Sequence, residues 1–447
     1  MLLLCLLLSW TLLGPVSAGR RAYVTIVNGD PAYVLGVRVL AYSMRKVHAA
    51  YPLVAIHTGT LDGEQMEELR RSGVELIQTP AMQVREGSIF FNKLAVWNLT
   101  MFERVVYVDA DAVFLQNADE LFSCAEFCAS YRTFEVFNAG VMVVTPNRQR
   151  LAQILALSRS QGYVEKMELS RSIPGTIDAH DQGLLNIAYE HCIQGPLFDP
   201  LIRRKREECQ RLSSVYNGDW PLLMLNSKTL ERIKILHYTM GPCKPWRWFW
   251  LPLFPRIQLW QDLRSELDGC FSFISCLSIR NLLGPLAVFI GLLFGIERLR
   301  HCWAPHIHLP VRSSSCSMGK LWFIPISYFW CSLLVVVCGA LSLCLTPWLA
   351  PARQGFAIFS LWFTALLPPI LIHILTCLNA QGSSKRPQPI YSTGWLVFCA
   401  LVVSGVPLLG LGSLWFFLPR VRRTGDRLVI LSASHTLSKS IHLYFSH

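Results

Sequence analysis

The stretch that decides the fold is VVYVDAD, residues 105–111. Its apolar, β-branched first half predicts a buried strand over 104–108. Asp109 and Asp111 follow one residue apart, where the strand ends. Carboxylate oxygens suit Mn²⁺ or Mg²⁺, which neutralise a nucleotide diphosphate, so the pattern favours a metal site. The alternative is a strand-end turn with two solvated acids, because a D-x-D pattern is common by chance.

The segments around this stretch alternate between strand-like and helix-like patterns. The predicted helices are 32–46, 64–71 and 93–99, and the predicted strands are 22–27, 53–57, 74–77, 104–108 and 140–144. This alternation predicts an α/β fold with a mainly parallel sheet. Ligands of such folds bind beyond the carboxyl ends of the strands, where Asp109 and Asp111 would lie.

A second polar motif is LHYTMGPCKPW, residues 236–246, which follows a β-type run. A neutral imidazole at His237 could complete the ligand set of a metal. Gly241 would let the backbone approach a phosphate, and Lys244 would offer it a point charge. A lone histidine is more often structural, and that alternative stays open here.

Two further motifs carry polar groups. In DAHDQGLLN, residues 178–186, the polar groups Asp178, Asp181 and Gln182 precede a helical run and could hold sugar hydroxyls or support chemistry at the anomeric carbon. The alternative is an ordinary helix cap. In FNAGVMVV, residues 137–144, Asn138 opens a strand beside two small residues, which could let a sugar approach the backbone. A tight turn is the other interpretation.

Taken together, the order of these motifs resembles glycogenin and its relatives, the retaining glycosyltransferases of family 8. The resemblance covers about residues 20–250 and implies a GT-A fold, Mn²⁺ as cofactor and a UDP-sugar as donor. It implies that the metal ligands are Asp109, Asp111 and His237 and that the sugar-side catalytic cluster is Asp178, Asp181 and Gln182. The donor-binding positions that it implies are Ile26, Asn28, Tyr33, Arg85, Lys93, Ala110, Asn138, Gly241 and Lys244.

The chain also departs from glycogenin. Asn28-Gly29 is not the usual pair in the uridine-contacting loop, and one extra residue follows His237. Glycogenin glucosylates its own tyrosine shortly after a stretch like Val215-Tyr216-Asn217, but the segment 218–225 has no tyrosine here, so self-glucosylation is not expected.

The whole chain looks like the plant inositol phosphorylceramide glucuronosyltransferases. That resemblance implies transfer of glucuronate to a Golgi sphingolipid, whose headgroup is the acceptor at a lipid bilayer. The alternatives are a family 8 transferase that acts on a polysaccharide or glycoprotein, and a glycogenin-like glucosyltransferase.

The net charge of +12 over 447 residues first suggests a nucleic-acid partner. Its distribution excludes that interpretation. Residues 1–270 carry 28 basic and 27 acidic residues, whereas residues 271–447 carry 13 basic and two acidic residues beside apolar stretches. This is the usual pattern of loops that flank membrane helices.

The resulting domain prediction has five parts. Residues 1–18 are a signal peptide or an uncleaved anchor, residues 20–250 are the catalytic domain, and residues 246–270 are an aromatic membrane-interface linker, with the edge of a folded core as the alternative. Residues 271–419 form an all-α multi-span membrane region with spans near 277–296, 324–346, 355–378 and 393–418. Residues 420–447 are a basic tail.

The positive-inside rule then places the catalytic domain in the Golgi lumen, although Arg420, Arg422 and Arg423 conflict with a count of four spans. Some of the cysteines Cys124, Cys128, Cys192, Cys209 and Cys243 could pair in such an oxidising compartment, but their connectivity cannot be predicted. A transporter would need paired polar residues inside the spans, and a non-catalytic sugar-binding module would need a broken metal site. Neither condition is met.

Overall fold

The structure is a computed structural model, and it describes part of the chain. The described residues are 19–82, 92–131, 136–162, 181–202, 208–219, 231–239, 241, 243–250, 256–269, 283–292, 337–350, 352, 354–363, 365–367, 420–424 and 427–431. The chain divides into two compact units, Met1–Pro245 and Trp246–His447. The predicted signal peptide or anchor at residues 1–18 lies outside the described residues.

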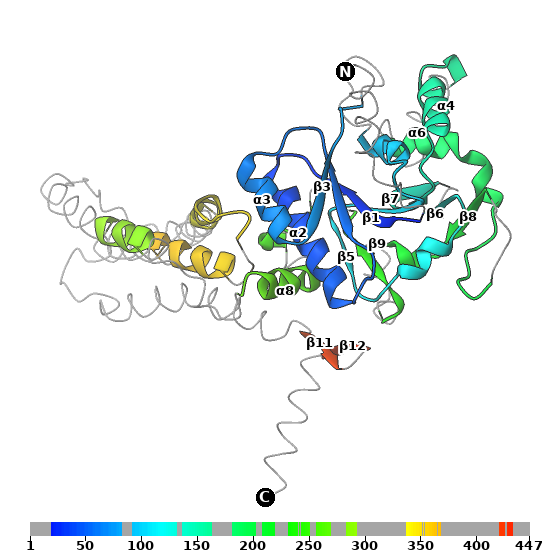
Figure 1. Cartoon of the computed structure of the whole chain (residues 1–447). Helices are drawn as coiled ribbons and strands as arrows, with labels where there is room; N and C mark the ends of the chain where they lie inside the picture. The colour runs from blue at the N-terminus through cyan, green and yellow to red at the C-terminus, as the bar shows by residue number, and fades with distance from the viewer. Residues whose placement is uncertain are drawn as a thin grey trace, which may run out of the picture. The chain divides into compact units, whose positions relative to one another are not determined.

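The first unit is built on a seven-stranded sheet with strand order β3-β2-β1-β4-β7-β6-β8. Neighbouring strands are parallel except where β7 meets β4 and β6, so β7 alone runs against the others. The mainly parallel α/β sheet that the GT-A resemblance predicts is therefore present (Figure 1). The strands are β1 (Arg21–Ile26), β2 (Leu53–His57), β3 (Val74–Gln78), β4 (Arg104–Val108), β6 (Phe127–Tyr131), β7 (Phe137–Val144) and β8 (Cys209–Leu212).

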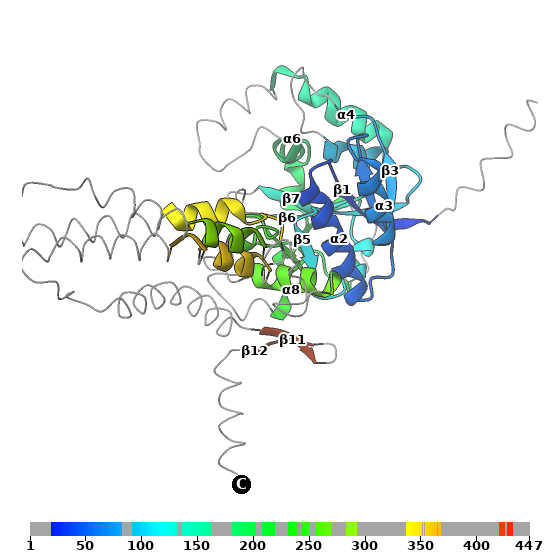
Figure 2. The same ribbon diagram turned by 90° about the vertical axis from the view of Figure 1, so that its left-hand side faces the viewer.

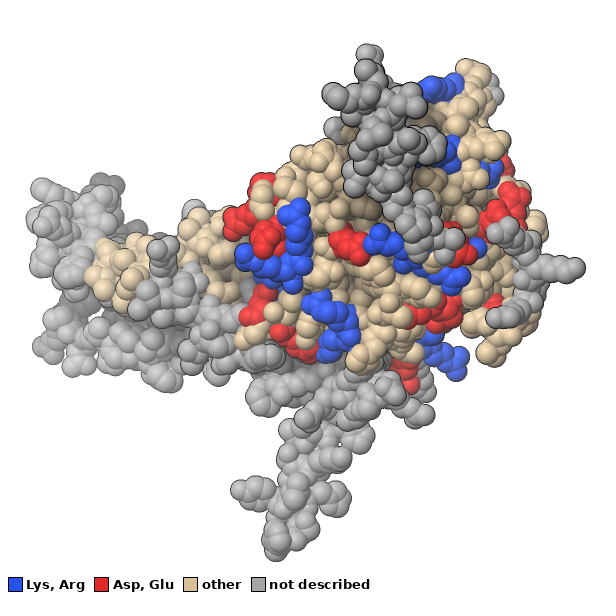
Figure 3. Space-filling view, in the orientation of Figure 1, with Lys and Arg blue, Asp and Glu red and all other residues tan. Residues whose placement is uncertain are grey.

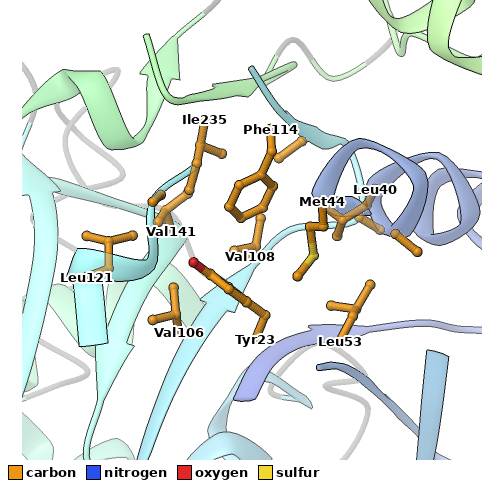
Figure 4. Packing of buried hydrophobic residues seen from close by; sticks show 14 of the residues in the cluster. Tyr23, Leu40, Met44, Leu53, Val106, Val108, Phe114, Leu121, Val141 and Ile235 are labelled. Carbon is orange, nitrogen blue, oxygen red and sulfur yellow. The ribbon is translucent and has the colours of Figure 1, made fainter. Parts of the chain in front are cut away.

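Both faces of this sheet are buried, because the strand residues alternate between two apolar clusters. In β4, Val106 and Val108 face the cluster that contains helix α2 (Pro31–Lys46), whereas Val105 and Tyr107 face the other cluster. Figure 4 shows the first cluster, where Met44 of α2 packs near Tyr23 of β1. Sheets of parallel strands are normally covered on both faces in this way.

Different helices cover the two faces (Figure 1, Figure 2). Helices α2 and α3 (Gly63–Arg71) contribute to the first cluster. The second cluster contains the short helix η1 (Asn92–Asn98), α4 (Arg148–Ser158) and α6 (Asp181–Ala188). Most predicted elements appear close to their expected bounds, but 93–99 is a 3-10 helix and β7 begins three residues before the predicted strand at 140–144.

The sequence of the loop between β1 and α2 explains where α2 begins. The Asp30 side chain accepts a hydrogen bond from the Ala32 backbone N–H at 2.9 Å, which caps α2, and Pro31 occupies the first helical position. An aspartate cap followed by proline starts helices efficiently, because it satisfies free backbone donors and presets the backbone angle. The carboxyl end of β1 and the start of α2 are thereby fixed at the edge of the sheet where β4 also ends.

Two disulfides lie at the far edge of the sheet, where β8 pairs with β6. Cys124 bonds to Cys128 at the start of β6, and Cys192 bonds to Cys209 at the start of β8. Cys243 is buried and belongs to neither of these disulfides. On the face of the molecule that Figure 3 shows, basic and acidic side chains are mixed, in agreement with the balanced charge of residues 1–270.

The prediction of an all-α multi-span membrane region is wrong. Within the described part of the chain, no helix combines the length and the apolar character that a membrane crossing needs. The described helical stretches of this region include 283–292 and 337–345. The second of them ends just before Pro347, which cannot continue a helix with normal hydrogen bonding. Much of the predicted spans lies outside the described residues.

The aromatic segment 246–270 places some of its tryptophan rings away from solvent. Trp246, Trp248 and Trp260 are buried, and Trp246 packs edge-on against Trp260 at 6.3 Å between ring centroids. The burial of these three tryptophans is compatible with the folded-core alternative, and the membrane-interface interpretation of residues 246–270 stays a prediction. The helix α8 (Ile257–Leu267) carries Trp260, and η7 (Trp248–Trp250) carries Trp248. In the predicted basic tail, β11 (Arg420–Thr424) and β12 (Arg427–Leu431) form an antiparallel pair.

Candidate active site

A second, three-stranded sheet brings the two strongest sequence motifs together. Its strand order is β5-β10-β9, formed by β5 (Ala112–Phe114), β10 (Ile235–His237) and β9 (Gly218–Asp219). Strand β5 begins directly after Asp111, and the antiparallel register sets His237 opposite Ala112. The Tyr238 N–H also donates to the Asp111 carbonyl at 3.0 Å. Backbone pairing alone therefore holds His237 beside the two aspartates, although more than a hundred residues separate them in the sequence.

The side chains of Asp109, Asp111 and His237 converge as a metal site requires. One ligand atom of each lies within 4.8 Å of the other two. His237 Nε2 lies 3.2 Å from Asp111 Oδ1 and 3.6 Å from Asp109 Oδ2. Two ligands at right angles on an ion with bonds of about 2.1 Å stand roughly 3 Å apart. Two carboxylate oxygens and one imidazole nitrogen therefore fit a divalent ion such as Mn²⁺.

Two lysines hold the carboxylates of this cluster. Lys93 Nζ lies 3.0 Å from Asp109 Oδ1 and 3.1 Å from Oδ2, and Lys244 Nζ donates to Asp111 Oδ2 at 2.5 Å. The Tyr107 hydroxyl also donates to Asp109 Oδ1 at 2.5 Å. These contacts fix both carboxylates, and they leave Asp111 Oδ1 and Asp109 Oδ2 facing the His237 ring.

The charges of the cluster shift two pKa values in the direction that keeps the groups ionised. Burial would raise the pKa of the Asp111 carboxyl, but His237 and Lys244 outweigh it and hold this pKa well below the ordinary value. Burial would likewise lower the pKa of the Lys93 ammonium, but Asp109 and Asp181 outweigh it, and the pKa of Lys93 is raised. Charged groups of both signs, an accepting carboxylate and a donating ammonium, therefore persist at neutral pH.

We refer to Asp109, Asp111 and His237 as the metal-type cluster. A chain of side-chain amides connects this cluster with α6. Asn138 Nδ2 donates to Gln182 Oε1 at 3.1 Å, and the Ala139 N–H donates to the same oxygen at 2.9 Å. Gly140 lies under the His237 ring so closely that a Cβ there would come within 2.0 Å of His237 Cε1. The small residues of the FNAG motif thus make room for the imidazole, rather than forming the tight turn considered above.

The remaining predicted positions fall into three groups. Burial raises the pKa of Tyr33, and Lys244, Asp111 and Asp109 also shift it, which places Tyr33 near the cluster. Asp181 is buried at the start of α6 and shifts the pKa of Lys93. Ile26 lies at the end of β1, and Asn28 lies in the turn that follows it. Ala110 is buried between the two aspartates of the metal-type cluster in the sequence. Arg85 and Asp178 lie outside the described residues.

Gly241 is exposed, and no atom lies within 4 Å of a Cβ built at this position. We therefore expect Gly241→Ala to leave stability and Mn²⁺ affinity unchanged. If the backbone here approaches the diphosphate of the donor, the added methyl group raises KM for the UDP-sugar roughly tenfold, about 1.4 kcal/mol. Steady-state kinetics with varied donor would measure this change. An unchanged KM would remove Gly241 from the predicted donor-binding positions.

Four residues at or beside the site were not among the predicted site residues. Asn217 contacts His237, Tyr107 contacts Asp109, and the Thr239 hydroxyl donates to the buried Asp219 carboxylate at 2.5 Å. Tyr107 lies inside the VVYVDAD stretch, but its hydroxyl could equally have pointed into the core. The other contacts depend on the pairing of β9 with β10, for which the sequence carries no readable signal.

A second group of metal-type side chains, His191, Cys192 and Cys209, lies near the edge of the sheet. The two cysteines form a disulfide, so their sulfurs are not the thiolates that bind metals. Of the two clusters found in the described part of the chain, only that of Asp109, Asp111 and His237 offers a suitable set of ligands.

The chain is similar to known sugar-transferring proteins. It is 31% identical over 267 residues to inositol phosphorylceramide glucuronosyltransferase 1 of Arabidopsis thaliana, covering 56% of this chain and 47% of that protein. It is 26% identical over 284 residues to galactinol synthase 1 of Ajuga reptans, covering 53% of this chain and 77% of that protein. The resemblance to the inositol phosphorylceramide glucuronosyltransferases is thereby confirmed, and these comparisons support the predicted class, a UDP-sugar glycosyltransferase.

The solved structures give a weaker comparison. The glycosyltransferase GlyE of Streptococcus pneumoniae TIGR4 has a TM-score of 0.37 and 17% identity, covering 56% of this chain and 64% of that one. No family model matches the chain. The chain spans about half the length of the glucuronosyltransferase it matches, with 47% of that relative covered.

Proposed function

We propose that this chain is a divalent-metal-dependent glycosyltransferase that transfers glucuronate from UDP-glucuronate, with retention, to inositol phosphorylceramide. The observation that carries the proposal is the convergence of Asp109, Asp111 and His237 at the end of β4, between two lysines. The name of the glucuronosyltransferase at 31% identity supports the choice of sugar and acceptor.

The residues of the site divide the work of such a transfer. Asp109, Asp111 and His237 would hold Mn²⁺, which when bound neutralises charge on the diphosphate of the donor. Lys244 lies beside Asp111 and would donate to a phosphate oxygen as negative charge develops on the departing UDP. Fixed donors aimed at developing charge are usually the largest contribution to such catalysis.

The sugar would lie between the cluster and α6. Asn138 and Gln182 are hydrogen-bonded to each other and to the backbone of β7, so their positions are set before a ligand arrives. Preorganised contacts of this kind lower the entropic cost of orienting the sugar. Asp181 is the described carboxylate at the start of α6 and would orient the donor or act at the anomeric carbon, two roles that kinetics can separate.

The acceptor and the compartment belong to the same proposal. The two disulfides, Cys124–Cys128 and Cys192–Cys209, support placement of the domain in the oxidising lumen of the secretory pathway, because such bonds are rare in reducing compartments. A sphingolipid headgroup facing the Golgi lumen would then be accessible to the site.

The proposal is tested by a donor and acceptor screen with the full chain. UDP-glucuronate, UDP-glucose and UDP-galactose would each be incubated with MnCl₂ and inositol phosphorylceramide in detergent micelles. We expect sugar transfer to the lipid with UDP-glucuronate, and its loss when the metal is removed with EDTA and its return when MnCl₂ is added. Mass spectrometry of the extracted lipid measures the product.

The other outcomes of the screen are equally informative. Transfer from UDP-glucose or UDP-galactose would replace the donor but keep the reaction class. Transfer only to a soluble glycan or protein would reject the lipid acceptor, and full activity in EDTA would reject the metal site.

A further inference from the structure

The side chain of Asn217 contacts the imidazole nitrogen of His237 that does not face the aspartates. Asn217 Oδ1 lies 2.9 Å from His237 Nδ1, while Nε2 of the same ring faces Asp111 Oδ1 at 3.2 Å. Asn217 is buried, with 2% of its surface exposed, and it directly precedes β9, which pairs with β10. Its contact with the ring is therefore shielded from solvent and held by backbone pairing.

Two backbone N–H groups decide which way the neighbouring amides point. The Gly140 N–H donates to one end of the Asn138 side chain at 3.0 Å, and the Ala139 N–H donates to one end of Gln182 at 2.9 Å. A backbone N–H cannot change its role, so both contacted ends must be oxygens. Asn138 Nδ2 then donates to Gln182 Oε1 at 3.1 Å, in agreement with both assignments.

The orientation of Asn217 follows from that of Asn138. Asn138 Oδ1 can only accept, so the Asn217 atom at 2.9 Å from it must be the donor Nδ2. The Oδ1 of Asn217 is then the atom that faces His237 Nδ1. Because this oxygen can only accept, Nδ1 carries the proton, and in the neutral ring the lone pair lies on Nε2.

We propose that Asn217 is a positioning residue that fixes the Nδ1–H tautomer of His237 and so presents Nε2 to the divalent ion. The inference rests on the proposed metal site, and it adds a residue that acts through one of the ligands. Hydrogen bonds behind a metal-binding histidine fix its tautomer and ring orientation, and their loss typically lowers metal affinity or activity by about 10–100-fold.

The test measures binding of MnCl₂ alone by isothermal titration calorimetry, without any sugar nucleotide. Asn217→Leu keeps the approximate volume but cannot accept from Nδ1, so we expect Mn²⁺ affinity to fall about 10–100-fold. Asn217→Asp keeps an acceptor facing Nδ1 although it loses the donation to Asn138 Oδ1, and we expect it to bind Mn²⁺ more tightly than Asn217→Leu does. Asn217→Ala replaces the leucine variant if the latter does not fold, which circular dichroism would show.

A matched control separates a loss of tautomer control from a general loss of stability. Asn117 donates to the His48 carbonyl at 3.1 Å and to Asp119 at 2.9 Å, and these partners lie outside the metal-type cluster. Asn117→Ala should lower the melting temperature and leave Mn²⁺ affinity unchanged. Equal losses of affinity in this control and in Asn217→Leu would overturn the proposal.

The ring nitrogen shifts give a readout that packing or added charge would not imitate. Long-range ¹⁵N–¹H spectra of the metal-free protein, with the His237 ring identified by its absence in His237→Gln, report which nitrogen carries the proton. We expect the proton on Nδ1 in the parent protein and in Asn217→Asp, and a mixture of tautomers in Asn217→Leu. A single unchanged tautomer in Asn217→Leu would overturn the proposal.

The two proposals fail differently. If the parent protein binds no Mn²⁺, or if Asp111→Asn binds it equally well, the metal site itself is wrong. If the parent binds Mn²⁺, Asp111→Asn loses it and Asn217→Leu binds as the parent does, only the positioning role of Asn217 is wrong.

Discussion

Asp111→Asn should lower kcat of sugar transfer by about 10³-fold, which corresponds to about 4 kcal/mol of lost transition-state stabilisation. Asparagine has the same shape, but it lacks the charge that holds the ion and pairs with Lys244 at 2.5 Å. The loss should persist at saturating UDP-sugar, because it removes a charge that matters most as UDP departs. Single-turnover measurements in excess MnCl₂ would check the rate of the chemical step.

The matched control for this substitution is Asp119→Asn. Asp119 also accepts several hydrogen bonds, among them those of the Tyr23 hydroxyl and the Ala50 N–H, each at 2.9 Å. Tyr23 belongs to the first apolar cluster, so these bonds support the core and not the metal-type cluster. We expect this variant to melt at a lower temperature while each folded molecule keeps its activity. Near-normal activity in Asp111→Asn, or an equal loss in both variants, would contradict the proposed metal site.

Gly140→Ala should cause the second large effect. The new methyl group would lie 2.0 Å from His237 Cε1 and 2.4 Å from Nδ1, so the buried ring must move. Overpacking of this kind costs about 1–3 kcal/mol of stability. A displacement of about 1 Å in a catalytic group can cost about 10²-fold in rate, and the ring here is also a proposed metal ligand. We expect kcat/KM to fall by at least about 10²-fold, with weaker binding of Mn²⁺.

Gly63→Ala is the control for this second prediction. Gly63 begins α3, and no atom lies within 4 Å of its added Cβ. Alanine favours the helix over glycine by up to about 1 kcal/mol, so stability should stay the same or rise slightly, with activity unchanged. Unchanged Mn²⁺ affinity in Gly140→Ala would show that the ring can move without loss of the ion, and it would contradict the role given to this glycine.

Much of the first unit could be predicted from local patterns. β1, β2, β3 and β4 are short β-branched runs bounded by turn residues, and α2 follows an aspartate–proline start, so local chemistry determined each of them. The direction of β7 could not be predicted in this way, because an apolar run has no preferred sense until it pairs. Its reversal matters, since it brings the start of β7, with Asn138, to the edge where β4 ends.

The site could be predicted only as far as its residue types carried a signal. Asp109, Asp111, His237 and Lys244 stand in recognisable motifs, and the structure brings them together. Asn217 lies in the glycogenin-like stretch 215–217, but no role could be assigned to it from the sequence, because its contact with His237 arises from the register of β9 with β10. The roles of all these residues in catalysis stay predictions until the variants are measured.

The second unit shows the limit of a hydropathy argument. Apolar stretches near 324–346 and 355–378 have the composition of membrane spans, but composition does not state where a helix ends. The helical stretch at 337–345 stops before Pro347, and Trp248 donates to the Pro347 carbonyl at 3.1 Å within the same unit. Local backbone chemistry therefore sets where this helix ends, and a sliding average over twenty residues does not detect such an end.

The pairing of two carboxylates with two ammonium groups in the site has a thermodynamic consequence. Asp109 and Asp111 together balance Lys93 and Lys244, so these four groups are electrically neutral without any bound ion. A bound Mn²⁺ would add two positive charges to these four groups, and the diphosphate of a nucleotide sugar would offset them. By linkage, each of the two ligands must then strengthen the binding of the other by the same factor. The metal and the sugar nucleotide would thus act as a cooperative pair, in which each binds more tightly once the other is in place.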